Sequence, residues 1–527
     1  MTIRLSVKKV YFVAILLIVL LGGFLRFNNL GVKEFSSTEL NTVLTIELSF
    51  FDMAIDRLKL GTIPFYYVLL KLFTKIFGVS EFSLRFFSAF LGTLSVYVIF
   101  LIGRFVFNSK VALIAAFLFS VSRNHLFFSQ WARANSACLF FLLVSIYFFM
   151  QAVSKNENGF WKKYTLFRII ALYLYGFPIF ISLAEFLHMI IFCKDKEKIK
   201  KFLFSTALIV VFLLPFWISI IFLIPQTAQE SGYIYIQNLP SSETLRSFYL
   251  AWGNSHLFYN RTGGRLFLYP MMFLSGIIIC FIRNKLYGLN LKRNVWSGSV
   301  TLSGFVFLWF FVPTGILYVF ACVFSQWLKV GFSFFNNAYF LPAESAYLLF
   351  VAVACFWSAE ILAVFKIRKN SLLRFCIILT LIGTLLSGRY GEIYNFYAQR
   401  NPEWRRAIAY IKDEVNRDEK IISYPWQNGR FISYYHAAAV KNGQTANYAP
   451  ISLHKNERIW LVVEDKEVES KAVFEEKLKK EFSILEVKDF YGVASYYLEV
   501  EREQKVFFIN DIILGKENSI QCTPFKG

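Results

Sequence analysis

The sequence predicts an α-helical polytopic membrane protein with a small soluble α/β domain at its C-terminal end. Of the 527 residues, 56% are apolar and 62 are phenylalanine. About eleven apolar runs follow one another when the shorter ones are counted, and many of them are long enough to cross roughly 30 Å of hydrocarbon. From Gly388 onwards the composition becomes charged and mixed, as in a soluble domain. We therefore expect a membrane domain over residues 1–388, which includes a first outer loop over 27–67, and a soluble domain over 389–527.

The apolar runs follow one another with short polar linkers between most of them. Val10 to Leu25 is interpreted as an uncleaved first helix, because Gly22-Gly23 offers no good small-x-small cleavage pattern before Arg26 and many further spans follow. In chain order, the predicted spans cover residues 10–25, 81–107, 110–121, 134–153, 166–177, 179–193, 202–224, 266–282, 300–324, 338–365 and 375–386.

The net charge of +21 comes from basic residues that cluster in the short linkers rather than on one soluble face. This pattern favours the positive-inside rule over nucleic-acid binding. The linkers expected on the cytoplasmic side, with Arg168 counted in the one that begins at Lys155, hold 22 Lys and Arg, whereas three short outer stretches hold 3. We expect a multi-pass protein of an inner (plasma) membrane, with a cytoplasmic N-terminus and an extracytoplasmic C-terminal domain.

The soluble tail has the alternating pattern of a small α/β domain. Asn401-Pro402 is expected to open a helix over 404–415, as a cap and a first-turn proline. β-Branched and aromatic content predicts strands over 420–424, 458–463, 482–487 and 493–500, with a second helix over 468–480.

Neither cysteines nor histidines show the spacing of a metal site. Six of the seven cysteines fall in or beside apolar runs, and only Cys522 lies in the soluble tail, so no disulfide framework is expected. The five histidines are scattered without ligand spacing. The sequence predicts no metal and no cofactor.

Glu39 is the first candidate for a functional residue. It lies about a dozen residues beyond the first predicted span, near the boundary between lipid and water, where a carboxylate needs a reason to stay. A solvated loop acid is the alternative. Asp52 and Asp56 share one helix face beside Arg57 and Lys59 and are interpreted as solvated.

Short motifs along the chain carry a resemblance to a known family. In order, they are Leu30-Gly31, Thr38-Glu39, Thr62 to Tyr67, Phe77 to Arg85, Gly103 to Phe107, Ser129 to Arg133, Tyr339 to Ala343 and Glu403 to Ala407. Together they resemble bacterial polytopic glycosyltransferases of the GT-C class, which include protein O-mannosyltransferases and the aminoarabinose transferases that modify lipid A. The resemblance touches nearly the whole chain and implies a GT-C-like fold.

The chain departs from the family pattern at polar positions near the site. Thr38 stands where the family has Asp, Thr62 where it has His, and Trp131 where it has Glu. Tyr175 stands where a His is often found, and Ala338 where an Arg precedes the late Tyr. The scaffold is therefore retained better than the polar residues of the site.

The resemblance implies transfer of a sugar from a polyprenyl-phosphate carrier to a glycan, lipid or protein acceptor on the outer face of the membrane. Such a reaction needs a carboxylate to take the acceptor proton and cations to hold the leaving phosphate. Glu39 is the expected base. Arg85 and Arg133, at outer ends of spans, are expected to bind the donor phosphate, with an interfacial anchoring role as the alternative.

Further residues could contact substrate. Glu34, Tyr66, Tyr67 and Gln130 are candidates near the outer boundary, although Tyr66 and Tyr67 also fit an ordinary aromatic belt. In the tail, the aromatic stretches 424–429 and 434–436 are weaker candidates for acceptor contact.

Two other functions stay open at this point. A catalytically degenerate homologue could bind the lipid carrier or serve as an assembly subunit in surface glycan biosynthesis, which the substituted positions favour. A transporter is disfavoured by the large outer loop, the soluble tail and the absence of visible internal repeats.

Overall fold

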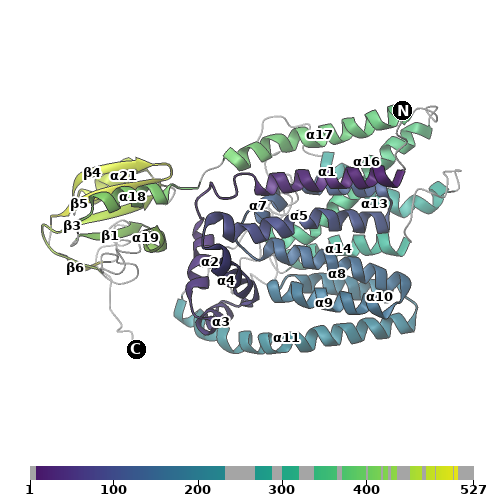
Figure 1. Ribbon diagram of the computed structural model, residues 1–527, viewed down its shortest axis with the longest axis horizontal. Coiled ribbons are helices and arrows are strands. Elements are labelled where there is room, and N and C mark those ends of the chain that lie inside the picture. Colours follow the sequence, from purple (N-terminus) through teal and green to yellow (C-terminus); the bar gives the residue numbers. More distant parts are fainter. Residues whose placement is uncertain are drawn as a thin grey trace. The chain divides into compact units, whose positions relative to one another are not determined.

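A computed structural model shows a helical protein with a small sheet near the C-terminal end of its chain (Figure 1). The structure describes residues 7–231, 268–287, 300–319, 337–364, 371–398, 401–416, 419–424, 429–435, 451–465, 470–480, 482–501 and 504–507. The chain divides into two compact units. We call residues 1–30 with 45–398 the helical unit, and residues 31–44 with 399–527 the tail unit.

Each predicted apolar run falls on a helix of the helical unit over its described part. These helices are α1 (Val7–Phe27), α5 (Glu81–Val106), α6 (Ser109–Ser120), α8 (Asn135–Lys155), α9 (Asn158–Leu174), α10 (Pro178–Phe192), α11 (Lys196–Ser231), α13 (Leu268–Tyr287), α14 (Val300–Val319), α16 (Leu341–Val364) and α17 (Ser371–Ala398). Within the described residues, five helices are long and apolar enough to cross a membrane, or six if the bent pair of α6 and α7 (Arg123–Ser129) counts as one span. The predicted fold class is confirmed.

The first outer loop contains three helices. They are α2 (Ser37–Glu47), α3 (Phe50–Lys59) and α4 (Phe65–Phe77), of which α4 begins in the loop and extends beyond it. A break before Phe50 separates α2 from α3. Ser49 is the N-cap of α3, and its hydroxyl accepts a hydrogen bond from the backbone N–H of Asp52 at 3.1 Å. A short 3-10 helix, η4 (Asn337–Phe340), precedes α16.

Helix α9 begins earlier than its apolar run. The run was expected from residue 166, after a basic linker, whereas the helix starts at Asn158. Trp161 and Tyr164 are buried on the inner face of this first part, while Lys162 and Lys163 are exposed on the other. An amphipathic first half of the helix was therefore mistaken for a linker.

Helices α13 and α16 pack with their backbones in close approach. A Cβ atom placed on Gly276 in α13 would lie 2.0 Å from the carbonyl oxygen of Phe350 in α16. Close approach of this kind needs a residue without a side chain, as at many helix contacts in membranes.

We expect Gly276→Ala to destabilise the helical unit by about 1–3 kcal/mol, because the added methyl group forces the two helices apart. Gly315 in α14 is the matched control, since a Cβ atom there meets nothing within 4 Å. Gly315→Ala should be neutral or slightly stabilising. Thermal unfolding of the purified full-length protein in detergent measures both; equal effects of the two changes would contradict the packing argument.

The tail unit is built on a four-stranded mixed sheet with the strand order β1-β3-β5-β4. Strand β1 (Lys420–Tyr424) pairs parallel with β3 (Arg458–Glu464), whereas β5 (Val493–Val500) pairs antiparallel with both β3 and β4 (Phe482–Phe490). Its helices are α18 (Trp404–Glu414), α19 (Gly429–Tyr435) and α21 (Lys471–Leu478), and a second, two-stranded sheet joins β2 (Ile451–Leu453) and β6 (Gln504–Phe507). The four strands and two helices expected from the sequence are present.

A buried core holds this sheet to α21. Ile459, Leu461 and Val463 on β3 are at most 1% exposed and pack with Phe474 of α21. Near β1, the carboxylate of Glu419 accepts hydrogen bonds from Tyr497 and Asn416. Burial raises the pKa of Glu419, but the hydrogen bonds to its charged form outweigh burial and leave the pKa below its usual value.

The boundary between the units differs from the expected one at residue 388. Helix α17 continues to Ala398 and belongs to the helical unit, while residues 31–44 of the first outer loop belong to the tail unit. Long-range hydrogen bonds within the tail unit explain this: the side chain of Asn401 donates to the carbonyl oxygen of Glu34 at 2.6 Å. A segment far away in sequence thus completes the tail unit.

Candidate active site in the helical unit

Two arginines converge on the hydroxyl of Tyr67. Arg133 Nη1 donates to Tyr67 Oη at 3.1 Å, and Arg57 Nη1 lies 3.5 Å from the same oxygen. The Arg57 guanidinium also lies over the Tyr67 ring, 5.0 Å from its centroid. Arg57 is buried and pairs with Asp56, whose own side chain is 41% exposed. Asp52 is exposed as well, so the two acids lie on a solvated face as expected, and only the buried arginine beside them was not foreseen. The four residues Arg133, Tyr67, Arg57 and Asp56 are called the arginine–tyrosine cluster below.

Ser88 in the first half of α5 contacts residues in and next to this cluster. Ser88 Oγ donates to the backbone carbonyl of Arg133 at 3.1 Å and lies 3.4 Å from Tyr66 Oη. Tyr66 is 1% exposed and packs edge-on against Tyr67 with ring centroids 5.6 Å apart. The structure therefore brings together three of the predicted residues: Tyr66, Tyr67 and Arg133.

Arg85 lies on α5, three residues before Ser88. Its side chain is 4% exposed, and its Nη1 donates to the carbonyl oxygen of Leu30 at 3.0 Å. That carbonyl lies just beyond the end of α1, so the guanidinium ties the beginning of α5 to the chain leaving α1. The spacing of three residues places Arg85 and Ser88 on the same side of the helix.

The side chain of Gln130 donates hydrogen bonds to backbone carbonyl oxygens at the end of α1. Its Nε2 lies within 3.1 Å of the carbonyl oxygens of Leu25, Arg26 and Asn28. The last carbonyls of a helix lack partners within the helix, and Gln130 supplies hydrogen bonds to them at the end of α1. Beside it, the Arg133 guanidinium lies over the Trp131 ring at 5.6 Å.

Glu39 belongs to the tail unit and forms a capping box with Ser36. The Ser36 backbone N–H and hydroxyl both donate to Glu39 Oε2 at 3.0 Å, and the Glu39 backbone N–H lies 3.4 Å from Ser36 Oγ. The carboxyl side chain is in the first turn of α2 and is 2% exposed. The interpretation of Glu39 as a solvated loop acid is therefore wrong.

Glu34 lies in the same segment and binds the first turn of α18. Its Oε2 accepts a hydrogen bond from the backbone N–H of Arg405 at 2.9 Å. Helix α18 begins at Trp404 with Glu403 at the N-cap position and no side-chain cap of its own. The expected cap by Asn401 is wrong, because Asn401 bonds to the backbone of Glu34 instead.

Two motif positions from distant parts of the chain meet near the start of α16. Tyr175 and Tyr339 have hydroxyl oxygens 3.5 Å apart. One turn into α16, the fully buried carboxylate of Glu344 accepts hydrogen bonds from the Ser122 hydroxyl and from Asn124 Nδ2, the latter at 3.2 Å. Glu344 was not a candidate in the sequence reasoning, although an acid inside an apolar run is a signal of function.

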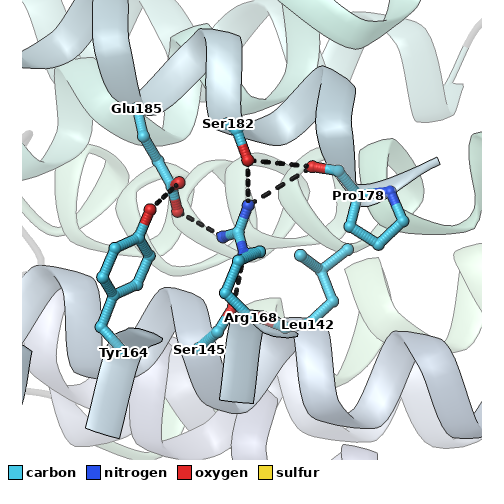
Figure 2. A network of polar contacts seen from close by, with 7 residues as sticks. All are labelled: Leu142, Ser145, Tyr164, Arg168, Pro178, Ser182 and Glu185. Atoms are coloured by element: carbon cyan, nitrogen blue, oxygen red, sulfur yellow. Dashed lines mark hydrogen bonds and ion pairs between the residues drawn. The ribbon is translucent and has the colours of Figure 1, made fainter. Parts of the chain in front are cut away.

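A second buried network joins α8, α9 and α10 (Figure 2). Arg168 Nη2 lies 2.5 Å from Glu185 Oε1, and both side chains have no solvent exposure. Tyr164 donates to the other carboxylate oxygen at 2.9 Å, and Arg168 donates to Ser145 and Ser182 at 3.1 and 2.9 Å. Arg168 had been counted as a cytoplasmic linker charge, which is wrong, because it is buried in the middle of α9.

Among the residues that the structure describes, no group of three or more His, Cys, Asp or Glu side chains could hold a metal ion. Thr62, which stands where the family has His, closes the end of α3. Its hydroxyl and its backbone N–H donate to the carbonyl oxygen of Arg57 at 3.0 and 2.9 Å.

Comparison with known proteins shows which fold this architecture resembles. Residues 62–222 match the model of a family described as dolichyl-phosphate-mannose-protein mannosyltransferase. The solved structure of the archaeal oligosaccharyltransferase AglB from Archaeoglobus fulgidus, in complex with an inhibitory peptide and a dolichol-phosphate, is similar with a TM-score of 0.54 at 12% identity, over 93% of this chain and 74% of that chain. ArnT from Cupriavidus metallidurans, bound to undecaprenyl phosphate, is similar with a TM-score of 0.51 at 11% identity, over 92% and 97%.

The chain has the fold of the GT-C class of glycosyltransferases. The resemblance seen in the sequence motifs is thereby confirmed at the level of the fold. An uncharacterized protein from Aquifex aeolicus is 27% identical over 163 residues, which are 31% of this chain and 32% of the relative. The match to this relative thus spans about a third of its length. Within this fold, the arginine–tyrosine cluster lies where α3 ends and where α4 and α8 begin.

Proposed function

We propose that the chain is a membrane glycosyltransferase that takes a sugar from a polyprenyl-phosphate-linked donor and transfers it to a glycan, lipid or protein acceptor on the outer face of an inner membrane. The observation that carries this proposal is the convergence of Arg133 and Arg57 on Tyr67 Oη. Both guanidinium groups are held in place by side-chain partners before any substrate arrives. Such a pair of cations suits a phosphate that gains charge as it leaves.

The reaction needs a base for the acceptor hydroxyl. In the proposed step, the acceptor oxygen attacks the anomeric carbon, the bond from that carbon to the phosphate oxygen breaks, and the polyprenyl phosphate leaves with the electron pair. The acceptor proton passes to a carboxylate. We propose Glu39 for this role and keep Arg85 as a further phosphate ligand, as the sequence motifs imply.

Polyprenyl phosphates occur in the solved structures of both similar proteins, AglB with dolichol-phosphate and ArnT with undecaprenyl phosphate. This supports a carrier of the same chemical class for the present chain. The apolar helices near the cluster would accommodate the lipid tail, since Phe82 and Phe90 on α5 are exposed.

A second candidate function is a catalytically degenerate homologue that binds the carrier without turning it over. It is favoured by the structural partners of residues at motif positions: Gln130 caps α1, Thr62 closes α3, and Glu39 completes a capping box. Reconstituted full-length protein given a radiolabelled polyprenyl-phosphate sugar separates the two. Transfer of label to an acceptor in a membrane extract supports the enzyme, whereas donor binding without transfer supports the homologue.

We expect Arg133→Gln to weaken the binding of polyprenyl phosphate by about 10-fold to 100-fold, because one charge-assisted hydrogen bond to the phosphate is lost. Lys75→Gln is the matched control, because this substitution also removes one positive charge. Lys75 lies on α4, and its Nζ is 5.2 Å from the centroid of the Phe50 ring. The control substitution should change affinity less than about twofold. Native mass spectrometry of the full-length protein with added polyprenyl phosphate measures both, and equal losses would argue against the cluster as the phosphate site.

A further inference from the structure

A large pocket lies at the opposite end of the helical unit from the arginine–tyrosine cluster. It has a volume of about 1050 Å³ and is lined by residues where α5, α8 and α10 end and where α11 and α14 begin. Nothing in the proposed transfer reaction uses this end of the bundle. The sequence predicts that it faces the cytoplasm, because the basic linkers gather there.

The charged residues that line the pocket are mostly basic. Arg104, Lys194 and Lys198 line it together with one carboxylate, that of Asp195, so two positive charges are in excess. Asp195 is already engaged, since its Oδ1 accepts hydrogen bonds from the backbone N–H groups of Glu197 and Lys198 at the start of α11, at 2.9 and 3.4 Å. Lys198 Nζ is 4.0 Å from Asp195 Oδ2. Within the part of the chain that the structure describes, Lys194 has no ion-pair partner.

His188 is the second observation that points to a ligand. Its side chain lines the pocket and has no solvent exposure. Phe192 and Phe305 surround the imidazole, with ring centroids at 5.2 and 5.4 Å. Among the residues that the structure describes, neither ring nitrogen has a hydrogen-bond partner. Burying a polar ring in this way is costly unless something bonds to it.

The walls of the pocket are apolar. Leu101 and Phe105 of α5, Tyr147 of α8 and Phe192 of α10 line it. The lining is therefore amphiphilic, because it combines cations, a buried imidazole that can donate a hydrogen bond, and apolar side chains. A free inorganic anion would leave the apolar walls without a partner, whereas a lipid would fill them.

We propose that this pocket binds an anionic phospholipid, with the phosphate of its headgroup at Lys194, Lys198 and His188 and an acyl chain against the aromatic wall. A phosphodiester offers acceptor oxygens that suit the ammonium groups and the imidazole N–H. Anionic lipids in the inner leaflet attract such basic clusters, at a depth where helix ends meet headgroups. The site is separate from the donor site of the proposed transfer reaction.

The test uses full-length protein in detergent, titrated with dioleoylphosphatidylglycerol and read by native mass spectrometry. The double variant Lys194→Gln/Lys198→Gln should weaken binding by about tenfold or more. The matched control Lys196→Gln/Lys200→Gln removes the same charge from the same linker at exposed residues that do not line the pocket. It should change binding less than about twofold. His188→Phe, which keeps the aromatic packing, should also weaken binding while leaving the unfolding temperature unchanged or raised.

Dioleoylphosphatidylcholine and inorganic phosphate serve as the other arms of the same titration. We expect dioleoylphosphatidylglycerol to bind more tightly than dioleoylphosphatidylcholine or inorganic phosphate. It is overturned if both lysine variants weaken binding equally, if the zwitterionic lipid binds as tightly, or if inorganic phosphate alone binds as tightly as the anionic lipid. Because the transfer assay does not depend on these residues, failure here is distinguishable from failure of the proposed function.

Discussion

Glu39→Gln should reduce the turnover of sugar transfer by about 100-fold to 10,000-fold, because the amide cannot accept the acceptor proton. The structure makes this substitution informative. A Gln at the third position of a helix also completes a capping box, so the hydrogen bonds from Ser36 to the side chain can persist. The fold should therefore survive the change that removes the base. Turnover of labelled polyprenyl-phosphate sugar by reconstituted protein is the measurement.

Two controls separate chemistry from structure. Ser36→Ala breaks the capping box and keeps the carboxylate; it should cost about 0.5–2 kcal/mol of stability and much less turnover than Glu39→Gln. Glu47→Gln removes an exposed acid from the last turn of the same helix and should leave turnover within about twofold. If Ser36→Ala and Glu39→Gln lower turnover equally, then Glu39 acts through the helix terminus and not as a base.

Arg168→Met should destabilise the helical unit by about 3–5 kcal/mol, because it leaves the Glu185 carboxylate buried without its cation. Both side chains have no solvent exposure, and Tyr164 supplies only one further hydrogen bond to the acid. Methionine matches the arginine stem in length, so lost packing contributes little. Thermal or denaturant unfolding of the detergent-solubilised protein, followed by tryptophan fluorescence, measures the loss.

The double variant Arg168→Met/Glu185→Met tests whether the loss comes from the unpaired charge. Replacing both members of a buried pair by apolar side chains is often neutral or stabilising, so the double variant should recover most of the stability. A double variant as unstable as the single one would show that the network acts through packing instead. A stable double variant that has lost transfer activity would show a functional role for the pair.

The helices of the membrane part could be predicted from the sequence because hydropathy alone decides them. In lipid, a single long apolar run can satisfy its backbone hydrogen bonds within itself only as a helix. Hydropathy failed where a helix is amphipathic or contains a charge with a distant partner. Arg168 was counted as a linker charge because the sequence does not reveal Glu185 facing it, 17 residues later.

The candidate site was predictable in part. The family motifs indicated Arg133, Tyr66 and Tyr67, which the structure brings together. Arg57 was overlooked because its spacing on an amphipathic helix suggests a solvated face, and only the folded loop shows it beneath Tyr67. By contrast, the capping box was readable from the sequence, since Ser36 and Glu39 have the required spacing.

In the soluble tail, local sequence patterns predict the strands and helices but not the contacts between distant segments. Its strands and helices follow from β-branched content and periodicity, yet the partner at the start of α18 is a carboxylate 371 residues earlier in the chain. No local pattern around Asn401 and Pro402 could reveal that contact. A carboxylate at a helix N-terminus is favourable because it accepts a hydrogen bond from an otherwise unpaired backbone N–H and interacts with the helix dipole. The acid from the distant segment therefore lets α18 begin without a side-chain cap of its own.

Residues 31–44 set a practical limit on dividing this protein. A fragment cloned from residue 399 onwards would lack both Glu34 and Phe35. The Phe35 ring packs edge-on against Tyr434, with ring centroids 5.7 Å apart. Such a fragment would expose the Tyr434 ring that Phe35 otherwise covers, and the first turn of α18 would lose its hydrogen bond to the Glu34 carboxylate. An expression strategy for the isolated domain should therefore graft this stretch onto it or supply it as a synthetic peptide.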